Sequence, residues 1–241
     1  MNLYMDTYNL RARLSVGIIL LSPILLGLYL QIEAVRNLST TAVMTLALIA
    51  ISNIIVVMTR LVGKKASNKI KQRRVYVRDC FKQMNRYSRE RICTNLIAVT
   101  PLFATLENEP ETEQDAVEYD RILDSAIDII EERTRNLKIV VDENITYGFC
   151  RNMLGVKKWG ILLALALYAL EFGLIQYDSL QYGNPEMVIT ILINTAYLCM
   201  WLFLVNANLV EFSANNYAEA ILKAAGSISF CTSNGEPSDN D

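Results

Sequence analysis

One acidic residue, Glu171, lies inside a run of otherwise uncharged residues that is long enough to cross a lipid bilayer. An ionisable side chain at such a depth marks either a polar contact between helices or an ion path. Asn194 lies at nearly the same depth in another apolar run, so we expect its side chain to hydrogen-bond with Glu171. Asn53 and Asn206 share a depth nearer the opposite surface. Glu171 therefore has three interpretations: a buried hydrogen-bonding group, a side chain that reaches water, or part of an ion or proton path.

Small residues recur at a spacing of four on the run that contains Glu171. They form two pairs, Gly160 with Ala164 and Ala169 with Gly173. Residues four apart share one face of a helix, and small side chains let two helices approach closely in a membrane. The pairs therefore predict packing faces for other helices or for other copies of the chain.

The segment 142–158 precedes this run and has an unusual composition. We expect a short helix, capped by Asp142, that lies in the membrane interface and leads through a glycine into the apolar run. Its distinctive residues are Tyr147, Gly148, Phe149, Arg151 and Asn152. The main interpretation is a structural connection; the alternative is that Arg151 binds a ligand or a lipid headgroup.

The familiar catalytic motifs are absent from the sequence. The chain contains no His, which removes the Ser-His-Asp and Cys-His arrangements and the H-E-x-x-H zinc motif. The glycine-rich nucleotide motifs and G-x-S-x-G are also missing. We therefore predict a non-enzymatic protein without cofactor or metal, whose five cysteines stay free thiols. A membrane enzyme of unfamiliar type remains an alternative.

The elements that position these residues are predicted from the distribution of charge. The chain has 241 residues, and four runs of about 20 residues are almost free of charge: 14–32, 37–59, 159–177 and 187–210. A helix needs about 20 apolar residues to cross about 30 Å of hydrocarbon. This segregation excludes a soluble globular enzyme, a disordered chain and a disulfide-built secreted domain. The predicted fold is all-α, a polytopic membrane protein with four transmembrane helices.

Basic residues predict the orientation of these helices. Of 23 Lys and Arg, 19 lie in the segment 60–158 between the second and third runs. The positive-inside rule therefore places this segment and both termini in the cytoplasm of a bacterial-type inner membrane. The expected organisation is a cytoplasmic N-terminus (1–13), a transmembrane hairpin (14–62), a cytoplasmic helical domain (63–158), a second hairpin (159–210), a cytoplasmic helix extension (211–226) and a disordered tail (227–241).

The cytoplasmic domain carries a split of charge. Residues 60–91 contain 12 basic and two acidic residues, and residues 107–132 contain 11 acidic residues and one basic residue. We expect a basic helix that continues the second span, an acidic helix that begins near Pro110, and a bundle of coiled-coil type in which the two neutralise each other. A nucleic-acid site is disfavoured, since the basic block adjoins the membrane and has an acidic partner in the same chain.

These expectations favour a non-enzymatic membrane assembly component or effector. It would form homo-oligomers in the bilayer and engage a cytoplasmic or membrane protein partner through the helical domain, without nucleic acid. The alternative is an ion- or proton-conducting subunit that uses Glu171. The order of elements is similar to that of flagellar and Tol/Exb-type stator subunits, a similarity of topology that no motif in the chain carries.

Overall fold

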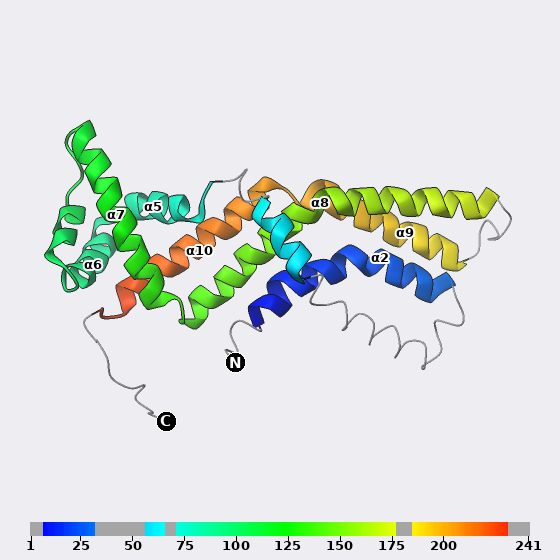
Figure 1. The fold of residues 1–241 in the computed structure, drawn as a ribbon, viewed down its shortest axis with the longest axis horizontal. Helices are drawn as coiled ribbons and strands as arrows, with labels where there is room; N and C mark the ends of the chain where they lie inside the picture. The colour runs from blue at the N-terminus through cyan, green and yellow to red at the C-terminus, as the bar shows by residue number, and fades with distance from the viewer. Residues whose placement is uncertain (1–6, 32–55, 66–70, 177–184, 231–241) are drawn as a thin grey trace, which may run out of the picture. The chain divides into compact units, whose positions relative to one another are not determined.

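The computed structural model describes residues 7–31, 56–65, 71–176 and 185–230, and all its regular elements in these ranges are helices (Figure 1). The expected all-helical class is confirmed there. The chain divides into two compact units. Unit 1 comprises Met1–Ile70 with Ile145–Glu211, and unit 2 comprises Lys71–Asn144 with Phe212–Asp241. The boundaries fall within helices α8 (Lys138–Gln176) and α10 (Ala207–Ser227).

Three helices are long and apolar enough to cross a membrane: Thr7–Leu30, Lys138–Gly173 and Pro185–Leu204. They contain most of the first, third and fourth expected spans. The second expected span, 37–59, lies outside the described residues except for its last four, which belong to a helix at 56–65. Many of the large apolar side chains on these helices are exposed, which is the arrangement expected of surfaces that face lipid.

The N-terminal helix contains two local departures from α-helical bonding. A π-turn, η1 (Leu10–Leu14), precedes α2 (Ser15–Gln31), and the amide of Ser15 bonds the carbonyl of Leu10. Pro23 lies within α2 and cannot donate to the carbonyl four residues earlier. The hydroxyl of Ser22 donates to that carbonyl, Ile19 O, at 2.8 Å. This is the side-chain replacement that Ser22 beside Pro23 predicts.

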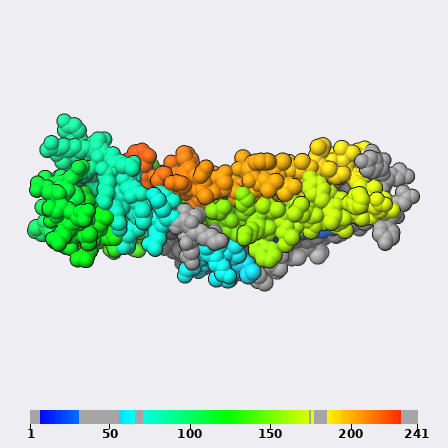
Figure 2. Space-filling model, turned by 90° about the horizontal axis from the view of Figure 1, so that it is seen from above, coloured from blue at the N-terminus to red at the C-terminus, as the bar shows by residue number. Residues whose placement is uncertain are grey.

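Helix α8 runs without a break from Lys138 to Gln176. The separate short helix expected over 142–158, with Asp142 as its cap, is therefore wrong. The segment contains no proline, and its glycines at 148 and 155 pack against other helices, so the backbone has no reason to leave the helical conformation there. In unit 1, α8 lies beside α9 (Pro185–Cys199), and their surfaces meet closely in Figure 2.

The fourth expected span is interrupted before it reaches α10. Helix α9 continues into a π-turn, η3 (Met200–Leu204), and Val205 then adopts an extended conformation. Asn206 starts α10, since its side-chain oxygen accepts the amide of Leu209 at 2.9 Å. The expectation of one helix from residue 187 to 225 is wrong, because an asparagine with this cap geometry begins a new helix.

Unit 2 is built from short helices rather than from one basic helix. Its elements are α5 (Arg73–Gln83), α6 (Arg86–Ile97), the 3-10 helix η2 (Pro101–Glu107), α7 (Glu113–Thr134), the start of α8 up to Asn144 and the part of α10 from Phe212 onward. The expected continuous basic helix is wrong, because Met84 and Asn85 are extended and the Asn85 side chain accepts the amide of Ser88. The acidic helix, expected to begin near Pro110, begins at Glu113, and the hydroxyl of its N-cap Thr112 accepts the amide of Asp115.

The acidic and basic helices of unit 2 pair through a ladder of ion pairs. Arg73 contacts Glu131 at 2.5 Å, and Arg74 contacts Asp128. One turn further along, Arg78 contacts Asp124 at 2.6 Å and Asp120 at 3.4 Å, and Lys82 contacts Asp120 at 2.5 Å. The residue numbers rise on α5 as they fall on α7, so the two helices run antiparallel. The expected neutralisation of the basic helix by the acidic one is present.

Candidate functional site

Helix α8 carries the residues around which unit 1 is assembled, and they lie at two junctions. At the first junction, the side chain of Asn152 is fully buried and its Nδ2 donates to the carbonyl of Ala12, in η1, at 2.7 Å. On another side, Asn152 lies so close to Gly63 that a Cβ on the glycine would collide with the Asn152 amide. Asn152 thus joins α8, the π-turn and the helix at 56–65; Asn152, Ala12 and Gly63 are called the first junction below.

Glycines permit the close approach at this junction. A Cβ on Gly155 would lie 2.9 Å from the backbone of Val62 and Gly63, a separation that real Cβ atoms do not show. Gly148 lies against the ring and hydroxyl of Tyr8 in the same way. The glycine pair at the crossing lets two helix backbones touch, as small residues do in membrane helices.

The second junction joins α8 to the interrupted fourth span. Nζ of Lys157 donates to the carbonyls of Leu202 and Val205 at 3.3 and 2.7 Å, where the π-turn ends. The indole of Trp201 is fully buried and packs directly on Gly160. A π-turn leaves backbone carbonyls without their usual helical partners, and the lysine supplies donors to two of them. The ammonium group of Lys157 therefore satisfies two backbone carbonyls at the end of the π-turn η3.

The predicted pair Glu171 and Asn194 is brought together across α8 and α9. Their side chains lie close enough to interact, as the equal depth of the two residues predicts. Asn194 is almost fully buried, and its Nδ2 also approaches the carbonyl of Ala164 at 3.4 Å. One carboxylate oxygen of Glu171 and the side-chain oxygen of Asn194 are buried without a hydrogen-bond partner among the described residues. A second polar contact, Tyr168 with Thr195 at 2.6 Å, joins the same helices.

The remaining predicted residues divide between internal and external positions. Gly160 and Ala164 face the core of unit 1, whereas Ala169 is exposed and Gly173 has no atom within 4 Å of its Cβ position. Both polar atoms of the Asn206 side chain are hydrogen-bonded: the oxygen accepts the amide of Leu209, and Nδ2 donates to the carbonyl of Phe203 at 3.0 Å. Asn53 lies outside the described residues.

The segment that contains Tyr147 and Arg151 lies at the start of the part of α8 that belongs to unit 1. Tyr147 is buried, and the guanidinium of Arg151 lies over its ring, 5.6 Å from the centroid. Phe149 packs against the core cluster that contains Met153 and Trp201. The structure therefore gives Gly148, Phe149 and Asn152 packing roles and leaves Arg151 half-buried over the ring of Tyr147.

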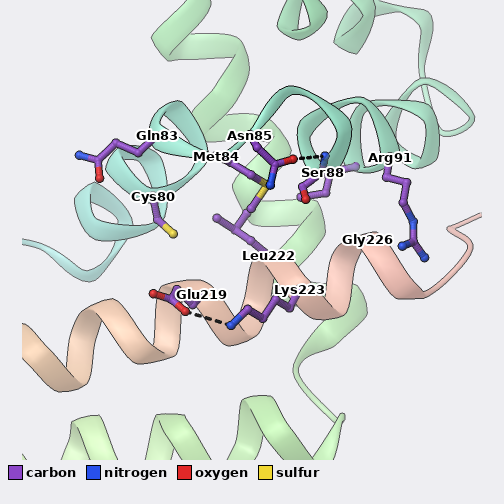
Figure 3. A pocket seen from close by; sticks show the side chains of 11 residues that line it. Cys80, Gln83, Met84, Asn85, Ser88, Arg91, Glu219, Leu222, Lys223 and Gly226 are labelled. Atoms are coloured by element: carbon purple, nitrogen blue, oxygen red, sulfur yellow. Dashed lines mark hydrogen bonds and ion pairs between the residues drawn. The ribbon is translucent and has the colours of Figure 1, made fainter.

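Unit 2 contains a hollow of about 500 Å³ between α5, α6 and α10 (Figure 3). Glu219 and Lys223, which line it, are paired with each other at 3.0 Å. Burial raises the pKa of the Cys80 thiol, so this sulfur is a poor nucleophile. The part of the chain that the structure describes holds no group of three metal-binding side chains.

Sequence reasoning missed four residues of the junctions: Tyr8, Gly63, Lys157 and Trp201. Gly63 carried a usable signal, since a glycine directly after an apolar run suits a close helix crossing. The partners of Lys157 and Asn152 had none, because each is a backbone carbonyl far away in the sequence. Comparisons with protein-family models, curated proteins and solved structures give no match to this chain.

Proposed function

We propose that the protein is a non-enzymatic component of a bacterial-type inner membrane that forms homo-oligomers in the bilayer. Unit 1 spans the membrane, with the expected second span completing four. Unit 2 lies in the cytoplasm, where it engages a protein partner. The observation that carries the proposal is the division of the small residues on α8 between two opposite faces.

Among the described residues, one face of α8 packs against other helices and the opposite face does not. Gly160 and Ala164 pack against the other helices of unit 1, and on the opposite face Ala166 and Ala169 are exposed and Gly173 is open. An outward row of small residues gains little from contact with lipid but allows a second helix to approach closely. This favours a second copy of the chain as its neighbour.

Unit 2 supports the second part of the proposal. It has its own apolar core, which includes Phe81, Leu96, Leu123 and Ile127, and an ion-paired charged surface. Such a unit does not need lipid contact for its stability. It is therefore suited to meet a water-soluble or membrane-bound protein partner.

The oligomer is tested by mass in detergent or in lipid nanodiscs. The chain has a mass of 27.3 kDa, and the proposal predicts a particle that contains a multiple of it. Ala169→Leu and Gly173→Leu should weaken self-association at least tenfold while leaving unit 1 folded. Ala196→Leu is the matched control, since it adds the same bulk to an exposed position on α9 and should leave the mass unchanged. A monomeric wild-type chain would contradict the proposal.

A second candidate function, conduction of ions or protons, rests on the unpartnered buried oxygens of Glu171 and Asn194. Such oxygens in a membrane are acceptors for a proton or a cation. Glu171→Gln keeps the shape and hydrogen-bonding capacity of the side chain but removes its titration. Conduction in proteoliposomes that disappears in this variant would favour this candidate, and the absence of conduction in both proteins would remove it.

A further inference from the structure

Three arginines from three helices converge at the first junction. Arg151 and Arg13 are the sequence neighbours of two junction residues, and Arg60 lies one turn before the third. The charges of Arg60 and Arg151 both act on the guanidinium of Arg13. The packing of the helices therefore holds three permanent positive charges near one another.

In the part of the chain that the structure describes, these arginines have no carboxylate partner. None of Arg13, Arg60 and Arg151 forms an ion pair within the described residues, and Nε of Arg13 and of Arg151 is buried without a hydrogen-bond partner. Two guanidinium groups are held in place by aromatic rings. Arg13 lies 5.0 Å from the ring centroid of Tyr8, and Arg151 lies 5.6 Å from that of Tyr147.

Like charges in a fixed cluster repel one another, and the repulsion is removed when an anion binds between them. Phosphate matches the chemistry of the cluster, because the planar guanidinium presents two parallel N–H donors to its oxygens. A carboxylate from the same chain would satisfy fewer of these donors. The cluster is thus suited to a phosphate group supplied from outside the chain.

The surroundings indicate where the phosphate comes from. Leu10 lies one turn before Arg13 and is 58% exposed, and Leu61 adjoins Arg60 and is 54% exposed. Met58, on the same helix as Arg60, is also exposed. Apolar side chains around a cationic cluster suit a ligand that has both a phosphate and acyl chains.

We propose that Arg13, Arg60 and Arg151 bind the phosphate of an anionic phospholipid at the point where three helices of unit 1 cross. The inference rests on the proposed insertion of unit 1 in the membrane and is independent of the proposed oligomer. The lipid would join the three helices electrostatically at a place where they otherwise repel.

The test measures lipid binding and stability in the same purified full-length protein. Dioleoylphosphatidylglycerol is added to the protein in neutral detergent, and bound lipid is counted by native mass spectrometry. Each of Arg13→Gln, Arg60→Gln and Arg151→Gln should weaken binding about fivefold. The matched control is Lys65→Gln, which removes an exposed charge from the other side of the helix that carries Arg60 and should have little effect.

A thermal unfolding experiment separates a binding site from a merely structural cluster. Without lipid, Arg60→Gln should unfold at the same or a higher temperature than the wild type, because repulsion is relieved. With phosphatidylglycerol, the wild type should gain stability as the lipid concentration rises, and the variant should gain less. Equal lipid stabilisation of both proteins, or equal loss of binding in Lys65→Gln, would overturn the proposal.

Further measurements distinguish a lipid phosphate from free phosphate and check that the variants are correctly inserted. Inorganic phosphate at millimolar concentration should not reproduce the stabilisation; if it does so in an arginine-dependent way, the lipid is not the ligand. Arg151→Lys keeps the charge but loses the planar pair of donors, and it should bind more weakly than the wild type and more tightly than Arg151→Gln. Resistance of each variant to extraction by alkali shows that insertion, on which the inference rests, is intact.

Discussion

The two units of this chain use polar side chains in opposite ways. In unit 2, the cations of α5 pair with the carboxylates of α7, in side chains such as Arg78 and Asp124 that are partly exposed to water. In unit 1, the polar contacts at the two junctions run from a side chain to a backbone carbonyl, as from Asn152 to Ala12 and from Lys157 to Val205. Unit 2 thus pairs opposite charges, whereas unit 1 uses side-chain donors to satisfy backbone carbonyls at irregular helix turns.

This difference follows from the solvent expected around each unit. Exposed ion pairs in water form easily, contribute little each and are screened by salt. In a bilayer an unpaired carbonyl has no water to bond, so a neutral amide or a lysine near the interface is the better partner. Unit 1 also depends on glycines that bring helices together, a device that unit 2 does not use to the same degree.

The largest effect is expected from Gly160→Leu in unit 1. The added side chain would occupy the space of the buried Trp201 indole, and overpacking of this kind costs about 3 kcal/mol. Both tryptophans of the chain lie in unit 1, so a red shift and an earlier transition in tryptophan fluorescence would report the loss. Ala196→Leu, which adds the same bulk at an exposed position of α9, is the control and should leave the transition in place. Identical transitions for the two variants would show that the first face is not packed as described.

A smaller loss is expected from Asn152→Leu. The substitution keeps the volume roughly but leaves the carbonyl of Ala12 without its donor, which costs about 2 kcal/mol in a dry site. Urea or thermal unfolding followed by tryptophan fluorescence measures this loss of stability. A stability equal to that of the wild type would mean that another group donates a hydrogen bond to the carbonyl of Ala12.

Alkaline pH should destabilise unit 2 through its core thiol. Burial raises the pKa of Cys93 from 9.0 to about 11. The folded state then holds a proton that the unfolded state has lost, so stability falls as the pH rises from about 9 to about 11, by about 1 kcal/mol at pH 10. Cys93→Ala should lack this part of the decline. The measurement is thermal unfolding followed by circular dichroism at pH 7 to 10.5, and parallel curves for the two proteins would contradict the prediction.

The smallest effect is expected from the ion-pair ladder. Arg78→Met should destabilise unit 2 by about 1 kcal/mol at low salt, because it leaves Asp124 without its cation and leaves Asp120 with Lys82 alone. The rate at which Cys93 reacts with a thiol reagent reports the opening of unit 2. Arg121→Met, which removes an exposed pair within α7, should change this rate very little. Added salt should reduce the difference in Cys93 reaction rate between Arg78→Met and the wild type, because it screens the charge pairs. A difference that grows with salt would argue against screened charge pairing.

The parts of the fold that follow from local spacing were predictable from the sequence. Ser22 beside Pro23 gave the replacement hydrogen bond, and the matched depth of Glu171 and Asn194 gave their contact. On the acidic helix, the helical spacing of apolar residues predicts a packing side made of Val117, Ile122, Ala126, Ile129 or Ile130, and Thr134. The structure buries Ile122, Ala126, Ile130 and Thr134, whereas Val117 lies near the exposed start of α7.

The parts that depend on distant backbone groups were not predictable. No sequence periodicity predicts the π-turns, and the backbone partner of Asn152 lies 140 residues away in the sequence. The break at Asn85 did carry a signal, since an asparagine three residues before Ser88 is a capping arrangement. The arginine cluster needed three helices to be placed before its members could be seen as neighbours.

We propose that unit 1 crosses the membrane and that unit 2 lies in the cytoplasm. Protease added to intact spheroplasts of a bacterial host tests this topology. We expect the segment 71–144 to stay uncut until the membrane is permeabilised, and then to be cleaved at exposed sites such as the α6 residue Arg86. Cleavage of that segment in intact spheroplasts would show that the proposed topology is wrong.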